Sequence, residues 1–519
     1  MKITYVTEEK DLNSKGFNMD YLDIKTLGDL KKSGYQPRSI KEELRANLIC
    51  RLRENENTFN GILGYDETVI PELQTAILSK HNIILLGLRG QAKTRIARLL
   101  INLLDEYIPV VEGSELNDDP LLPLSRVARD IIEKDGDNTK ISWMHRSERY
   151  TEKLATPDVS VADLIGDVDP IKAAALKLPY SDERVIHFGL IPRSHRGIFV
   201  INELPDLQAR IQVSLFNILQ ENDIQIRGFK VRLPLDIQFV FTANPEDYTN
   251  RGSIVTPLKD RIDSQILTHY PRTVQISKEI TKQEADLADD QKVSVKSSTL
   301  LEDLIEQVAF EARGSEYIDS KSGVSARLTI SAYENLISAA ERRMIINNET
   351  ETNLRITDIY GIIPSITGKI ELVYEGEQEG PAKVAHILIG KAIRTLFAAH
   401  FPIPEKLKKI QEVNPYQIII NWFGKGNLLD LYMNSSTKEY EKSLMKIPGL
   451  KELLPKYAPH IKDEKEKLLY MEFALHGLSE YSLISKLHVD SGLQFKDMLS
   501  SMLTMTDEED EELNNDFFK

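Results

Sequence analysis

The sequence predicts an α/β protein with a doubly wound parallel sheet, followed by a helical domain and then a mainly helical C-terminal domain. Three apolar runs carry this prediction: IILLG at 83–87, GIFVI at 197–201 and IQFVFTA at 237–243. Helical patterns alternate with them, which is typical of a parallel sheet that is covered by helices on both faces. In such a sheet, ligands bind beyond the carboxyl ends of the strands.

The composition predicts a globular protein that does not bind nucleic acid in general. The chain has 519 residues, of which 41% are hydrophobic and 28% charged, enough for about three domains. Its formal net charge of -15 argues against nucleic acid, because such binders cluster Lys and Arg. The single cysteine, Cys50, cannot form an internal disulfide, so a reducing compartment is expected. Since no apolar leader and no run of roughly 18 apolar residues is present, we expect a cytoplasmic protein without a membrane segment.

Changes in composition divide the chain into five expected regions. A polar lead-in comes first, followed by the α/β domain, a helical lid domain, a mainly helical C-terminal domain of unknown role and an acidic tail. The lead-in contains one predicted helix, in which Ile40, Leu44, Leu48 and Leu52 share a face. In the same order, the five regions span residues 1–57, 58–271, 272–350, 351–505 and 506–519.

The first apolar strand leads into a glycine-containing loop, GLRGQAKT, at 87–94. The loop differs from the usual phosphate-binding pattern G-x-x-x-x-G-K-[ST] at Ala92, which stands where a glycine is expected. Gly87 and Gly90 permit a tight turn with inward N–H groups, while Lys93 reaches the terminal phosphates and Thr94 offers a hydroxyl to Mg²⁺. Because the chain enters a helix here, we expect Ala92 to adopt helical dihedrals and to preserve the loop. The predicted nucleotide-binding residues are Gly87, Leu88, Arg89, Gly90, Gln91, Ala92, Lys93 and Thr94.

Two further apolar strands end in polar residues that suit ATP hydrolysis. GIFVINELPDL places Asn202 and Glu203 where phosphate-loop enzymes normally have a carboxylate for magnesium and a second one for water. Glu203 is the predicted general base, whereas Asn202 keeps a carbonyl near magnesium but lacks the charge. From the sequence we therefore expect Asn202→Asp to lower the magnesium concentration needed for activity. The third strand ends at Asn244, which is placed to orient the attacking water.

With these strand ends in this order, the sequence resembles the ring-forming AAA+ ATPases, specifically the branch of the MoxR proteins and subunit I of magnesium chelatase. The resemblance covers residues 59–347. Alanine before the lysine, as in GLRGQAKT, is common in MoxR-type loops. The stretch His195-Arg196-Gly197 resembles the sequence through which the chelatase subunit enters its Walker B strand.

The resemblance implies a role for each of the polar residues. Arg261, in TPLKDRID, matches the arginine that such rings insert into the site of the neighbouring subunit. Arg327, in SGVSARLTI, matches the sensor 2 arginine of the lid, which touches the phosphate of its own subunit. Since an arginine donated across a boundary makes hydrolysis depend on assembly, a homo-oligomeric ring, expected to be hexameric, is implied. Walker A is matched by Lys93 and Thr94, Walker B by Asn202 and Glu203, and sensor 1 by Asn244.

The leading prediction is an ATPase that uses ATP and Mg²⁺ to remodel a partner protein. Relatives of this kind usually work with a von Willebrand A domain protein, and because the chain shows no D-x-S-x-S metal site, that partner is expected to be separate. Two alternatives stay open. One is a magnesium chelatase subunit that drives magnesium into protoporphyrin. The other is a nucleotide-binding scaffold with little turnover, because Asn202 carries no charge.

A hairpin is predicted in NDIQIRGFKVRLPL, with Arg227-Gly228 as its turn. It is either a surface feature or an element that faces the pore of a ring.

Overall fold

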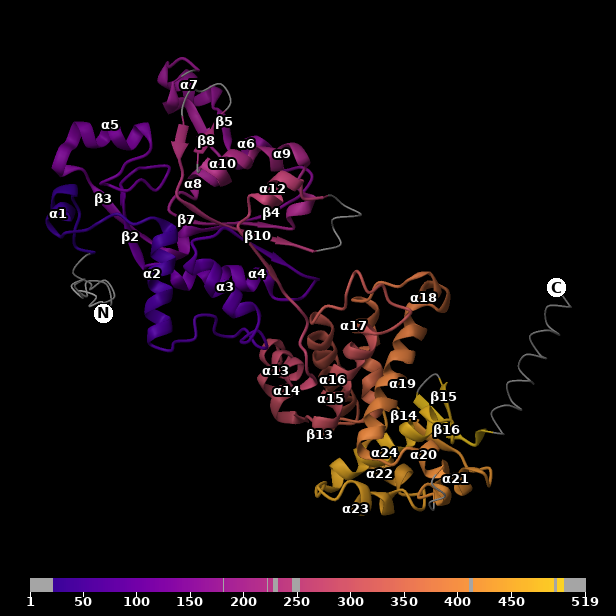
Figure 1. Ribbon diagram of the computed structural model, residues 1–519. Helices are drawn as coiled ribbons and strands as arrows, with labels where there is room; N and C mark the ends of the chain where they lie inside the picture. The colour runs from indigo at the N-terminus through magenta and orange to yellow at the C-terminus, as the bar shows by residue number, and fades with distance from the viewer. Residues whose placement is uncertain are drawn as a thin grey trace, which may run out of the picture. The chain divides into compact units, whose positions relative to one another are not determined.

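The computed structural model describes residues 22–180, 182–221, 223–226, 232–244, 253–409, 414–489 and 492–498. The chain divides into two units, Met1–His269 and Tyr270–Lys519. The first contains the parallel sheet and the second is mainly helical, which confirms the predicted fold class (Figure 1). In the described ranges, no helix combines the length and the apolar character needed to cross a membrane.

A five-stranded parallel sheet forms the centre of the first unit. Its strands are β1 (Ile83–Leu86), β4 (Tyr150–Leu154), β7 (Gly197–Asn202), β10 (Ile237–Ala243) and β11 (Ser264–Leu267). They lie in the order β11-β1-β10-β7-β4. The chain passes from β1 to the edge strand β4, returns through β7 and β10, and then forms β11 on the other side of β1. The strand order therefore reverses next to β1, and such a switch point is where open α/β sheets bind their ligands.

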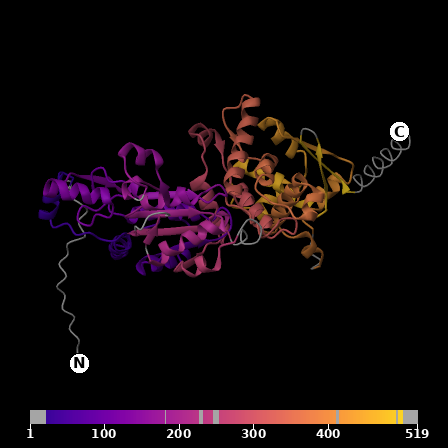
Figure 2. The ribbon, with the colours of Figure 1, turned by 90° about the horizontal axis from the view of Figure 1, so that it is seen from above.

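Both faces of this sheet are buried, as expected for parallel strands with continuous apolar runs. Along β1, Ile83 and Leu85 belong to one hydrophobic core, and Ile84 and Leu86 to the other. Helices cover the two faces separately, and the strands lie side by side between them (Figures 1 and 2). The first face is covered by α2 (Ile40–Arg53), α3 (Val69–Leu78) and α4 (Lys93–Leu99), and the second by α9 (Ala209–Ser214), α10 (Phe216–Glu221) and α12 (Thr256–Asp260).

Helix α2 is the helix predicted in the lead-in, and its start is fixed by a side-chain cap. Ser39 and Glu42 form a capping box at its start. Ile40, Leu44 and Leu48 are buried as predicted, whereas Leu52 is 38% exposed because the last turn projects beyond the core.

The remaining elements of the first unit are short helices and two-stranded pairs. The helices are α1 (Leu27–Lys32), α5 (Arg126–Asp135), α6 (Val161–Leu164), α7 (Pro170–Leu176) and α8 (Leu190–Arg193). The antiparallel pairs are β2 (Tyr107–Val111) with β3 (Ile141–His145), β5 (Gly166–Val168) with β6 (Ile186–Phe188), and β8 (Asp223–Gln225) with β9 (Arg232–Pro234). The last pair is the predicted hairpin, and its predicted turn at Arg227-Gly228 lies outside the described residues.

A single hydrophobic core runs through the second unit from Val295 to Phe495. It therefore joins residues from both of the regions expected at 272–350 and 351–505, and the division between those regions stays a prediction. The helices are α13 (Val274–Glu284), α14 (Asp289–Ser294), α15 (Thr299–Arg313), α16 (Arg327–Ile346), α17 (Ile363–Thr367), α18 (Tyr374–Glu379), α19 (Pro381–His400), α20 (Pro404–Lys409), α21 (Gln417–Phe423), α22 (Thr437–Leu444), α23 (Leu454–Tyr457) and α24 (Glu464–Glu480).

Two small sheets accompany these helices. A parallel pair joins β12 (Val295–Lys296) to β13 (Thr352–Asn353). An antiparallel sheet has β16 (Gly492–Lys496) between β14 (Leu429–Tyr432) and β15 (Ser485–Val489).

Candidate functional site

The carboxyl ends of β1, β10 and β7 are level with one another. In the register of the sheet, Leu86 lies beside Ala243, and Ile201 lies beside Phe241. Polar and glycine residues follow these positions on all three strands, so they meet at one edge of the sheet. These residues are Gly87, Asn202, Glu203 and Asn244.

The loop after β1 is held tightly against the rest of the first unit. A Cβ atom at Gly87 would collide with Thr268 Oγ1 and Gln91 Oε1, so only glycine fits. Thr268 donates its hydroxyl hydrogen to Gln91 Oε1 at 2.7 Å, and the Tyr65 hydroxyl donates to the Gln91 carbonyl at 3.0 Å. The side chain of Gln91 is therefore used to brace the loop.

Ala92 does not adopt the helical dihedrals predicted from the sequence. Its φ is 56° and its ψ is 15°, which is the left-handed region, and α4 begins only at Lys93. The prediction was wrong because the residue before the lysine turns the chain into the helix and is not yet part of it. An L-residue costs about 1–2 kcal/mol in this region, which explains the glycine of the usual pattern.

Lys93 is buried inside the loop, with 7% of its surface exposed. Its Nζ donates to the carbonyls of Gly87 and Leu88, the latter at 3.0 Å, and to Asn244 Oδ1 at 2.7 Å. The structure thus brings together the predicted Walker A lysine and the predicted sensor 1 residue. The ammonium is held between the first residues of the loop and the end of β10.

Glu203 follows β7 in a left-handed conformation, with φ 54° and ψ 50°. Non-glycine residues are uncommon in this region, and they cluster at functional sites. The Glu203 N–H donates to Thr242 Oγ1 at 3.2 Å, and the Thr242 hydroxyl donates to Asn202 Oδ1 at 3.0 Å. Thr242 therefore links the predicted general base to the residue that replaces the expected acid.

A carboxylate that the sequence did not reveal lies beside Asn202. Asn202 Nδ2 donates to Glu152 Oε1 at 2.6 Å, and Arg98 donates to the two Glu152 oxygens at 2.9 and 3.2 Å. The segment YTEKL around Glu152 is short and polar and lies at the edge of the sheet, so it gives no strand signal of the kind that identified β1, β7 and β10. Glu152 is part of the site only because β4 pairs with the apolar strand β7 in the sheet.

The two predicted arginines have different surroundings. Arg261 Nε donates to Gln220 Oε1 at 3.1 Å and Nη1 donates to the Pro257 carbonyl at 2.7 Å, while the guanidinium lies 5.0 Å from the ring centre of Phe216. Arg327 is exposed at the start of α16 in the second unit. The roles expected for Arg261 and Arg327 stay predictions.

The start of α4 suits a magnesium ion that is bound mainly by a nucleotide. Within the described ranges, no group of three or more His, Cys, Asp or Glu side chains is arranged to hold a metal ion. Mg²⁺ usually takes one or two protein oxygens and completes its shell with phosphates and waters. Thr94, the half-buried second residue of α4, offers such an oxygen.

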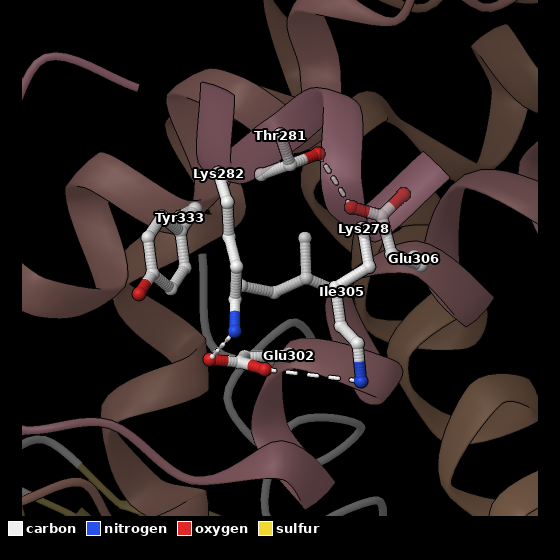
Figure 3. Close-up of a pocket in the computed structure, with 7 residues that line it drawn as sticks. All are labelled: Lys278, Thr281, Lys282, Glu302, Ile305, Glu306 and Tyr333. Atoms are coloured by element: carbon white, nitrogen blue, oxygen red, sulfur yellow. Dashed lines mark hydrogen bonds and ion pairs between the residues drawn. The ribbon is translucent and has the colours of Figure 1, made fainter. Parts of the chain in front are cut away.

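A small pocket in the second unit is structural in character (Figure 3). Lys278 bonds to Asp303 at 2.7 Å and Lys282 to Glu302 at 2.8 Å, so both ammonium groups on α13 are neutralised by α15. Figure 3 shows the two lysines converging on Glu302. These ion pairs join two helices of the core, and we assign the pocket no ligand.

Comparison with known proteins gives only distant likenesses. No family model matches the sequence. Among solved structures, the chain is similar to a complex of subunits BchI and BchD of magnesium chelatase (18% identity, 62% of this chain and 98% of that chain, TM-score 0.32). It is also similar to RuvB of Thermotoga maritima (12% identity, 75% and 97%, TM-score 0.33). A third match, to NtrX of Brucella abortus, has 13% identity and a TM-score of 0.30, and covers 56% of this chain and about half of NtrX (55%).

These TM-scores are low, so the chain's own fold and site must carry any functional argument. The fold and the site define an α/β protein with a tightly held glycine-containing loop at the carboxyl end of β1, next to the point where the strand order reverses.

Proposed function

We propose that this chain is a magnesium-dependent ATPase of the AAA+ type that resembles the MoxR and magnesium chelatase branch. In this proposal it uses ATP to remodel a partner protein. The observation that carries the proposal is the 2.7 Å hydrogen bond between Lys93 Nζ and Asn244 Oδ1. This bond joins the Lys93 ammonium, which would contact the terminal phosphates, to the Asn244 amide, which would orient the attacking water. The two residues follow the adjacent strands β1 and β10.

The chemistry assigned to the chain needs three side chains. Lys93, already desolvated in the loop, exchanges its bond to Asn244 for the terminal phosphates, where its positive charge offsets developing negative charge. The released Asn244 amide orients the attacking water. Glu203 accepts the proton of that water, an assistance worth roughly 10²–10⁴ in rate. A bound Mg²⁺, with Thr94 as a protein ligand, would neutralise phosphate charge.

Assembly and partners follow from the same proposal. We assign Arg261 to the site of a neighbouring subunit in a ring, expected to be hexameric, and Arg327 to the nucleotide of its own subunit. A separate von Willebrand A domain protein is the proposed partner, and the cytoplasm the proposed compartment. The alternative of a magnesium chelatase subunit uses the same ATP chemistry, and it is tested by magnesium insertion into protoporphyrin when candidate partner subunits are supplied.

One observation favours a second candidate, a nucleotide-binding scaffold with little turnover. Both polar atoms of the Asn202 side chain are bonded to protein: Oδ1 accepts from Thr242, and Nδ2 donates to Glu152. In this arrangement the Asn202 oxygen is already bonded to Thr242 and carries no charge, so weak magnesium binding would limit hydrolysis.

Phosphate release by the assembled protein, with ATP and magnesium, separates motor from scaffold. The control is Glu203→Gln, which preserves size and removes the base. We expect the wild type to hydrolyse ATP at least about 10²-fold faster than Glu203→Gln, while both bind ATP equally. Equal rates for the two proteins, across conditions that include candidate partners, would leave the scaffold as the better account.

A further inference from the structure

The end of β7 has an unusual chemical arrangement: an amide stands where an acid is expected, and an acid reaches it from the next strand. Asn202 is 7% exposed, and its Nδ2 lies 2.6 Å from Glu152 Oε1. β4 and β7 run parallel, with Glu152 beside Val200 and Leu154 beside Asn202, so Glu152 and Asn202 project from the same face of the sheet.

That face is the one that α4 covers, and α4 begins with the loop lysine. Arg98 of α4 donates to both oxygens of Glu152, at 2.9 and 3.2 Å. Thr94 and Arg98 are four residues apart on α4, so they lie on the same side of the helix, one turn from each other. Glu152 is thus bonded to the side chain that follows Thr94 by one helical turn on the same side of α4.

In the described part of the chain, Glu152 is the acceptor in each of its hydrogen bonds. Besides Asn202 and Arg98, the Tyr150 hydroxyl donates to Oε2 at 3.1 Å. The surroundings are those of a carboxylate that acts as an acceptor.

We propose that Glu152 is the acidic residue of this magnesium site, an inference that rests on the proposed function. β4 supplies this acid in place of an acid at the end of β7, and Asn202 positions it. Glu152 and Asn202 would then act as a pair. The pair carries the single negative charge of one carboxylate, and the amide directs that charge toward magnesium-bound water. Partners that orient the surroundings of a metal typically change its affinity 10- to 100-fold when they are removed.

The Arg98 ion pair does not prevent this role. The Arg98 side chain is 62% exposed, and such exposed pairs contribute only about 0–1 kcal/mol. The arginine can therefore leave the carboxylate when a divalent cation and a nucleotide enter, because the cation offers a stronger interaction than a solvated guanidinium.

The pair also changes what Asn202→Asp should do. With an aspartate at position 202, two carboxylates would face each other at the distance of a hydrogen bond, and like charges that close cannot both stay ionised without a large cost. Asn202→Asp alone should therefore weaken the site. Adding Glu152→Gln should restore magnesium binding. The double variant again has one acid and one amide, but the acid is then on β7 and the amide on β4.

The test measures the binding of a fluorescent ATP analogue to the full chain while magnesium is titrated, with the unfolding temperature of each variant as a control for folding. Glu152→Gln should raise the magnesium concentration needed for half-maximal tightening by about 10-fold or more and leave binding without magnesium unchanged. Asn202→Asp should do the same, and the double variant should return close to wild type. Glu148→Gln, an exposed glutamate in the turn before β4, is the matched control and should have no effect.

The alternative is that Glu152 only ties β4 to α4. In that case Glu152→Gln would lower the unfolding temperature without moving the magnesium titration. Asn202→Asp would improve magnesium binding, and the double variant would not return to the wild-type titration. Any of these magnesium results would overturn the proposal. If the wild type bound ATP and Glu152→Gln needed the same magnesium concentration as the wild type, only this inference would fail. If the wild type did not bind ATP, or bound it no better than Lys93→Ala, the proposed function would fail together with this inference.

Discussion

The backbone N–H of Asp236 donates a hydrogen bond to Nδ1 of His195 across 3.0 Å. This bond requires a neutral imidazole. Burial, followed by the nearby Arg196 charge, lowers the pKa of His195 to about 4, and burial raises the pKa of Asp236 to about 6. Asp236 Oδ2 in turn accepts from the backbone N–H of Ile40, so the two groups fix the start of α2 to the sheet.

We predict that these two groups oppose each other in the pH dependence of stability. Between pH 6.5 and about 4 the unfolded His195 takes up a proton and the folded one does not, so stability falls as pH falls. Asp236 is protonated in the folded state below about 6 and in the unfolded state only near 3.8, so it adds stability as pH falls. Asp236→Asn should remove this compensation, so between pH 6 and 4 the variant should lose on the order of 3 kcal/mol more stability than the wild type.

Urea unfolding at a series of pH values measures this difference. Asp137→Asn, at an exposed aspartate of the same unit, is the control and should follow the wild type. Parallel pH profiles for Asp236→Asn and the wild type would show that Asp236 does not titrate in this range.

Binding of ATP should require Lys93. Its ammonium is the charge held inside the loop by the carbonyls of Gly87 and Leu88 and by Asn244, and alanine removes that charge while leaving the backbone in place. Lys93→Ala should abolish the binding of labelled ATP in an equilibrium assay, whereas Lys80→Ala, at an exposed lysine of the same unit, should bind normally. Wild-type affinity in Lys93→Ala would mean that the loop does not hold the nucleotide.

Arg261 should act on the neighbouring subunit. We expect Arg261→Ala subunits to lose turnover and to regain part of it when mixed with Lys93→Ala subunits, because each supplies what the other lacks at one shared site. The matched control is a subunit with both substitutions, which should rescue nothing. The assay is phosphate release, with mixed assembly checked by differently tagged subunits; mixed rings without recovery would contradict a role across the boundary.

Ala92→Gly should stabilise the protein, although glycine usually destabilises helical segments. The left-handed backbone at Ala92 costs an alanine about 1–2 kcal/mol, and glycine removes this cost. Glycine also makes the unfolded chain more flexible, which offsets part of the gain. A net increase of about 1 kcal/mol in the free energy of unfolding is therefore expected. Ala174→Gly, at an exposed helical alanine of α7, should instead cost about 1 kcal/mol. Chemical unfolding of the two variants gives both values, and a loss at both positions would show that Ala92 is not strained.

The apolar strands and the loop between them could be predicted because each is encoded within a few consecutive residues. β1, β7 and β10 are buried on both faces and read as continuous apolar runs, and Lys93 and Asn244 follow from their spacing to those runs. The three-stranded sheet of the second unit and β4 lack such runs, so propensity alone did not separate them from loops.

The pairing of Asn202 with Glu152 could not be predicted for a different reason. The two residues are 50 positions apart, and only the parallel register of β4 and β7 brings them together. The conformation of Ala92 was also missed, because its dihedrals depend on how the loop closes over Lys93 and not on the helix propensity of alanine.

The continuous core of the second unit limits how this chain can be shortened or recombined. α15 packs against α19, and α19 packs against α24, so the helices that precede residue 350 share their apolar faces with helices far beyond it. A chain that ended after α16 would leave those faces without cover. A variant that keeps α13 to α16 folded must therefore also keep α19 and α24, because each set of helices covers the apolar faces of the other.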